Sequence, residues 1–96
     1  MAIKLAQNYP SYGGILMKYR SRPEIQACIL EAAKGGASKT RLMYKAFLSY
    51  FQAVAYTKEL LQGGMLEYDS SEDVYRTSSR GIDFLKVYRD LEQLVS

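Results

Sequence analysis

The 96-residue chain has no histidine and no tryptophan, and it has a single cysteine. Because histidine is the side chain that most often serves as a general base or a metal ligand, its absence excludes the commonest acid–base and metal chemistry. Cys28 can form no disulfide within the chain, and without histidine it lacks the usual base of a catalytic thiol. It falls in the apolar run Ala27–Leu30, so we interpret it as a small core residue in a reducing compartment.

Further signs of catalysis or metal binding are missing. The glycines form isolated pairs rather than a phosphate-binding loop. The carboxylates of Asp69, Glu72 and Asp73 have neither the spacing nor the glycine of a calcium-binding loop, and we interpret them as an exposed acidic turn. We therefore expect no cofactor, no metal, no small-molecule substrate and no enzymatic activity.

The sequence also lacks a long apolar run. No segment approaches the roughly 18 apolar residues of a membrane span, and no apolar segment of a signal peptide follows the first residues. Hydrophobic residues make up 48% of the chain, which is ordinary for a globular protein, and the length suits one domain. We expect a cytoplasmic protein with no membrane partner.

What the sequence does have is an uneven distribution of charge. Residues 1–45 hold eight basic and two acidic residues, a balance of +6, whereas residues 46–96 hold five basic and eight acidic residues, a balance of −3. A basic half favours a polyanionic partner, although the same charges could serve only to keep the protein soluble.

Three helices are expected in the first two thirds of the chain. The first ends at the glycine pair 35–36, the second is short, and the third runs over about residues 50–62 before the next glycine pair. Their expected N-terminal caps are Ser21 or Arg22, Ser38 and Ser49.

After residue 64 the apolar pattern changes from helical to alternating. Residues 65–68 and 74–77 are short β-type runs around a polar turn, which predicts a hairpin. A last helix begins at Ser78 or Ser79, and Ile82 and Leu85 are expected to pack on the domain. Its apolar residues with heptad spacing, a candidate dimer interface, are Phe84, Tyr88, Leu91 and Val95.

Three helices followed by a two-stranded hairpin are typical of a winged helix-turn-helix. The expected fold is therefore α+β and mostly helical, with a C-terminal dimerisation helix. We divide the chain into an N-terminal arm or short strand at residues 1–17, the winged domain at 18–78 and the dimerisation helix at 79–96.

Three blocks occur in this order within residues 18–95: KTRLMYKAFLSYFQ, LLQGGMLEY and YRTSSRGIDFL. In these blocks the chain resembles the small archaeal winged-helix DNA-binding proteins whose C-terminal helix dimerises as an antiparallel coiled coil. The resemblance implies a homodimer that binds double-stranded DNA, either as a chromatin-type architectural protein or as a weakly selective transcription regulator. It also implies a nucleoid-associated location.

In a helix-turn-helix the third helix enters the major groove of DNA. Its expected contacts come from Ser49, Tyr50, Gln52 and Lys58, and the amide of Gln52 suits an adenine edge. Because this helix has no arginine, we expect phosphate contacts to outweigh base contacts. The other expected DNA contacts are Lys39, Arg41, Tyr44 and Lys45 on the second helix, and Arg76 and Arg80 near the base of the wing.

The aromatic residues divide between core and surface. Phe47, in the turn between the helices, is expected in the core, and Tyr56 is expected to be half-buried. Tyr44, Tyr50 and Phe51 are expected to face outward, where they could contact DNA or another protein. Together with the acidic wing they leave an alternative open, a protein–protein interaction module within a larger nucleic-acid assembly.

Overall fold

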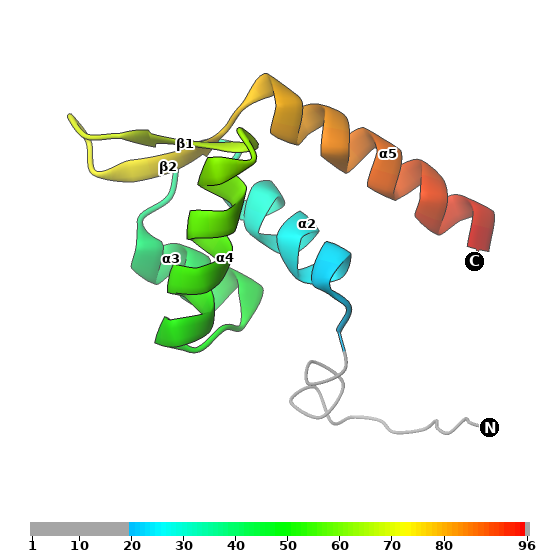
Figure 1. Cartoon of the computed structure of the whole chain (residues 1–96), viewed down its shortest axis with the longest axis horizontal. Helices are drawn as coiled ribbons and strands as arrows, with labels where there is room; N and C mark the ends of the chain where they lie inside the picture. Colours follow the sequence, from blue (N-terminus) through cyan, green and yellow to red (C-terminus); the bar gives the residue numbers. More distant parts are fainter. Residues whose placement is uncertain (1–19, 96) are drawn as a thin grey trace.

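The computed structural model describes residues 20–95, which form a winged helix-turn-helix of the expected α+β, mostly helical class (Figure 1). The predicted arm at residues 1–17 lies outside the described residues. In chain order the elements are α2 (Arg22–Ala32), α3 (Lys39–Ala46), α4 (Tyr50–Gln62), β1 (Leu66–Asp69), β2 (Val74–Thr77) and α5 (Ser79–Val95).

Serine caps fix where the first three helices begin. Ser21, Ser38 and Ser49 have extended backbone angles, and each side chain accepts a hydrogen bond from the backbone N–H three residues further on. In α2 and α4 the residue at that position, Glu24 or Gln52, accepts in return from the N–H of the cap. The three predicted caps are therefore confirmed.

The prediction that Phe47 lies in the core is wrong. Phe47 ends α3 in the left-handed conformation, with φ at 55°, and its side chain is exposed. The following residue, Leu48, is the buried one, and its N–H donates to the carbonyl of Met43 at 2.9 Å. Because the chain reverses direction at a left-handed residue, the side chain after it, rather than its own, enters the core.

The wing is an antiparallel hairpin with one additional contact. Leu66 of β1 lies opposite Thr77 of β2, and β1 begins one residue later than predicted. Ala37 extends this small sheet: its N–H donates to the carbonyl of Tyr75 at 2.9 Å, and the N–H of Tyr75 donates back at 2.8 Å. This bridge was not predicted, because a single residue carries no alternating pattern.

One core joins α2, α3, α4 and α5 to the wing. α5 begins at the predicted boundary, yet Leu85 lies in the same core as the other helices, so the first half of α5 is part of the domain. Its second half extends away from α3 and α4 (Figure 1). The largest of the side chains with at most 2% exposure are those of Ile29, Leu30, Leu42, Leu60, Leu66 and Leu85.

Candidate nucleic-acid interface

The helix pair α3–α4 has one inward and one outward face. Leu42 and Ala46 bury the inner side of α3, while Ala53, Thr57 and Leu60 bury that of α4. With helical periodicity these positions leave a continuous strip of each helix facing solvent. The exposed side chains of this outward face include Arg41, Tyr44 and Lys45 on α3 and Phe51, Ala55 and Lys58 on α4.

Four aromatic side chains gather at the end of α3, the turn and the start of α4. Their exposed fractions are 76% for Tyr44, 62% for Phe47, 57% for Tyr50 and 82% for Phe51. The rings of Tyr50 and Phe51 meet edge to face with centroids 5.8 Å apart. The outward placement predicted for Tyr44, Tyr50 and Phe51 is confirmed. We call these four residues the aromatic patch.

The charge around this patch has one sign. Residues 32–58 contain no aspartate or glutamate, and Glu59, the one acidic residue of α3 and α4, forms an ion pair with Arg22 at 2.7 Å. Arg41, Lys45 and Lys58 are exposed, and Lys39 is half-buried with its Nζ 5.9 Å from the centre of the Tyr75 ring. The basic residues of this segment are Lys34, Lys39, Arg41, Lys45 and Lys58.

Two of the residues predicted to contact DNA also fix the start of α4. The N–H of Ser49 donates to Oε1 of Gln52 at 2.9 Å, and the N–H of Gln52 donates to Oγ of Ser49 at 3.2 Å. The amide oxygen of Gln52 is therefore engaged within the protein. The signal for this was present in the sequence, because serine followed three residues later by glutamine is the pattern of a capping box.

The wing is acidic at its tip, and its arginine is held by carboxylates. Nη2 of Arg76 lies 2.8 Å from Oε1 of Glu72 and 3.7 Å from Oδ2 of Asp69, and Nη1 donates to the carbonyl of Gly35 at 3.2 Å. Hydrogen bonds from Ser71 lower the pKa of Asp69, so this carboxyl keeps its charge to lower pH than usual. Arg76 therefore has partners within the wing rather than an open guanidinium.

On the other side of the wing tip, the hydroxyl of Tyr68 donates to Oδ1 of Asp73 at 2.5 Å. This hydrogen bond to a carboxylate raises the pKa of Tyr68. Asp73 itself adopts a left-handed backbone conformation, with φ at 54°. The acidic turn is predicted to be exposed, and these contacts fix its conformation.

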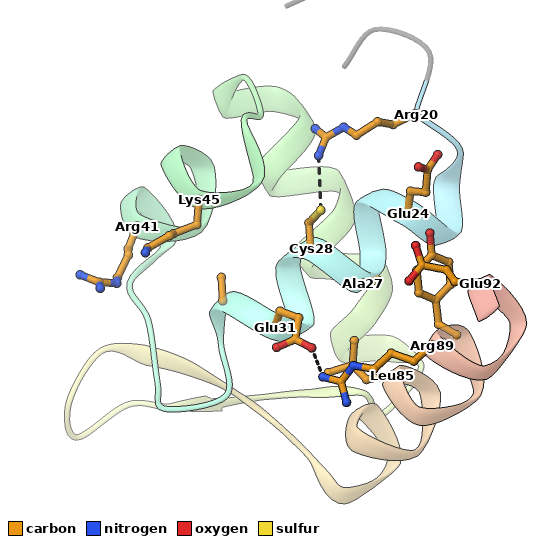
Figure 2. A pocket seen from close by; sticks show the side chains of 12 residues that line it. Arg20, Glu24, Ala27, Cys28, Glu31, Arg41, Lys45, Leu85, Arg89 and Glu92 are labelled. Carbon is orange, nitrogen blue, oxygen red and sulfur yellow. Dashed lines mark hydrogen bonds and ion pairs between the residues drawn. The ribbon is translucent and has the colours of Figure 1, made fainter. Parts of the chain in front are cut away.

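A shallow cleft of about 600 Å³ lies over α2, between α3 and α5 (Figure 2). Arg20 bridges its upper end: Nη2 donates to the carbonyls of Ala46 at 2.5 Å and Phe47 at 3.4 Å, and Nη1 lies 3.5 Å from Sγ of Cys28. A guanidinium at the carbonyl end of α3 suits the negative end of the helix dipole. Arg20 thus helps to hold the turn that carries Phe47, while half-buried Cys28 packs against the core.

At the lower end of the cleft, Glu31 ties α2 to α5 through an ion pair with Arg89 (Figure 2). Glu31 also pairs with Lys34 at 3.3 Å. Partial burial acts to raise the pKa of Glu31, but the hydrogen bonds from Arg89 and Lys34 hold it below its ordinary value. Arg41 and Lys45 border the cleft from the α3 side, so both charges lie at the edge between the cleft and the outward face.

Residues 20–95 contain neither a cluster of metal-ligating side chains nor a membrane-spanning helix. No group of three or more histidine, cysteine, aspartate or glutamate side chains in this part of the chain could hold a metal ion. No helix in the same range is long and apolar enough to cross a membrane.

Comparisons with known proteins agree with this architecture. No curated protein matches the chain in sequence. Among solved structures, the chain is similar to Sso10a-2, described as a DNA-binding protein from Sulfolobus solfataricus, with a TM-score of 0.71 and 23% identity over 78% of this chain and 81% of that one. At this identity the likeness concerns the fold. The family model for the winged helix-turn-helix matches residues 19–96, so the chain belongs to the winged helix-turn-helix family.

Proposed function

We propose that the protein binds double-stranded DNA through the outward face of α3 and α4, with α4 in the major groove. The observation that carries this proposal is the exposed set of Arg41, Lys45 and Lys58 in a segment, residues 32–58, that contains no acidic residue. A surface of one charge sign attracts the phosphate backbone and releases its counterions. Binding, without catalysis, is the whole of this proposed activity.

The phosphate contacts come from α3 and the adjoining helix. Lys39, Arg41 and Lys45 lie along α3, whose N-terminal backbone N–H groups and dipole also favour an anion. Lys58 lies two turns into α4. Arg80, in the first turn of α5, is exposed and supplies a further contact near the wing. Arg76 is left out of this set, because its guanidinium pairs with Glu72 and Asp69.

The protein discriminates weakly between sequences, which favours an architectural role or a weakly selective regulator associated with the nucleoid in the cytoplasm. Arginine makes the commonest specific contact to guanine, and α4 has none. The oxygen of Gln52 is engaged in the capping box, which leaves its NH₂ group to donate to a base. Phe51 and Ala55 offer only apolar contact, such as that with a thymine methyl group.

The protein acts as a dimer joined by the C-terminal part of α5. Val87, Leu91 and Leu94 follow one another at spacings of 4 and 3, with exposed fractions of 66%, 54% and 83%. This stripe is shifted from the predicted seam, because Phe84 and Tyr88 pack partly against the core of their own domain. Of the seam, Leu91 and the exposed Val95 stay available to a partner copy.

Fluorescence anisotropy with a labelled duplex of random sequence tests the proposal. We expect binding at low salt and a steep fall in affinity as salt is raised, because each neutralised phosphate adds about 0.9 to the slope of log K against log salt. Absence of binding at low salt would contradict the proposal. It would favour the alternative of a protein–protein module, to which the acidic wing and the exposed aromatic residues would then belong.

A further inference from the structure

The aromatic patch is larger than phosphate binding requires. Tyr44, Phe47, Tyr50 and Phe51 leave most of their surface in water, although aromatic side chains gain more than most by burial. Lysine and arginine alone would hold the backbone of a duplex. Exposed aromatic surface concentrated within eight residues of the chain, from Tyr44 to Phe51, is typical of a place where another molecule binds.

Phe47 belongs to the patch, and its backbone conformation in the turn is unfavourable for phenylalanine. Phe47 has φ at 55°, a conformation that non-glycine residues rarely adopt and that favours glycine or asparagine at the end of a helix. Arg20 stabilises this arrangement through its contacts with the carbonyls of Ala46 and Phe47. An unfavourable backbone conformation that presents an aromatic side chain to solvent is typical of a binding site.

The charges around the patch identify the class of its partner. Arg41 and Lys45 are exposed within the same α3 turn as Tyr44, at the edge of the cleft, and no acidic residue occurs from residue 32 to residue 58. Lysine is depleted at the core of protein–protein interfaces. Aromatic rings beside a basic surface are instead what single-stranded nucleic acid binds, since bases stack on the rings while the phosphates contact the cations.

We propose that the aromatic patch stacks on unpaired bases, so that the protein binds a locally melted DNA duplex more tightly than a fully paired one. This proposal rests on the proposed DNA binding by the same face of the molecule. Arg41, Lys45 and Lys58 hold the backbone in both cases, and the rings of the aromatic patch add stacking only where bases have left the helical stack.

Competition binding tests this with two labelled duplexes of one sequence, of which one carries a short run of mismatched pairs at its centre. Phe51→Leu keeps an apolar side chain but removes the ring. We expect it to lower affinity for the mismatched duplex about five- to a hundredfold more than affinity for the paired duplex, because the loss of one stacked base applies only where bases are unpaired. Phe51→Tyr should retain the preference of the wild type.

A spectroscopic signal distinguishes stacking on bases from electrostatic attraction to phosphates. The chain has no tryptophan, so Phe51→Trp provides one emitter that can be excited apart from the nine tyrosines and the DNA bases. We expect its fluorescence to be quenched by the mismatched duplex and by oligothymidine, but much less by the paired duplex. Tyr68→Leu, at an exposed aromatic position on the acidic wing, is the matched control and should keep the preference for mismatched DNA.

The outcomes separate this inference from the proposed function. Equal affinity of the wild type for paired and mismatched duplexes, or an unchanged preference in Phe51→Leu, would overturn stacking while leaving duplex binding intact. Failure to bind any of these DNAs would overturn both, and the patch would then be a surface for contact with protein.

Discussion

Arg41 and Lys45 are the residues on which the proposed phosphate contacts chiefly depend. They lie one turn apart on α3, both are exposed, and both border the cleft. Arg41→Ala and Lys45→Ala should each weaken binding to all duplexes alike and reduce the salt slope by about one unit per lost contact. Anisotropy over a salt series measures both quantities. Lys86→Ala, an exposed lysine on α5, is the control that should leave the slope unchanged.

Gln52 has a structural role that can be separated from a role in recognition. Gln52→Glu keeps the acceptor for the N–H of Ser49 and adds a negative charge that the start of a helix favours, so stability should be maintained. The same charge should repel phosphate and lower DNA affinity. Gln52→Ala should instead cost up to about 1 kcal/mol of stability through loss of the cap contact. Thermal unfolding and anisotropy test the pair.

If Gln52→Glu binds DNA as well as the wild type does, residue 52 does not lie near the phosphates, and the orientation proposed for α4 is wrong. A selection from randomised duplexes adds a second test. Loss of preference at an adenine position in Gln52→Ala would show that the remaining NH₂ group contacts a base.

The exposure and the contacts of single residues were predictable from the sequence only in part. The exposure of Tyr44, Tyr50 and Phe51 followed from helical periodicity. That of Phe47 did not, because it depends on a left-handed backbone conformation that favours glycine or asparagine over phenylalanine. The partners of Arg76 could not be predicted either, because they depend on how the hairpin places Asp69 and Glu72 beside β2.

At the scale of elements, close packing between α5 and the wing limits which residue can occupy position 81. A Cβ on Gly81 would clash with the carbonyl oxygen of Met65 and would lie 2.6 Å from Cγ2 of Thr77. Gly81→Ala should therefore destabilise the fold by about 1–3 kcal/mol, even though alanine favours a helix. Gly35→Ala is the matched control, because nothing lies within 4 Å of its Cβ position.

Chemical denaturation measures both variants. The control should stay within about 1 kcal/mol of the wild type. Equal stability of Gly81→Ala and wild type would mean that α5 does not sit on Met65 and β2 as closely as described, and the division of α5 into a packed and a protruding half would need revision.

The elements themselves were largely predictable, because each local signal agreed with the others. Serines followed by helical periodicity gave the starts of α2, α3 and α4, and alternation gave both strands to within one residue. The bridge from Ala37 to Tyr75 depends on tertiary contact alone and left no local pattern. Tertiary contact also decides the place of Phe84 and Tyr88. Their spacing fits a dimer seam, but they pack partly on their own domain.

At the scale of the whole molecule, the protruding half of α5 should hold two copies together. Leu91→Lys would place a charge against the partner helix, so the mass measured by light scattering at micromolar concentration should fall from dimer to monomer. Asp90→Lys introduces the same side chain one position away from the apolar stripe and should remain dimeric. A dimer that survives Leu91→Lys would exclude this stripe as the main interface.

Mapping amide chemical shifts while duplex is added to the labelled protein shows whether the outward face of α3 and α4 contacts DNA. We expect the largest changes within residues 38–58, including Arg41, Phe51 and Lys58, and little change at Glu72 in the acidic wing tip. Changes concentrated on the wing or on α5, with residues 38–58 unaffected, would contradict this expectation.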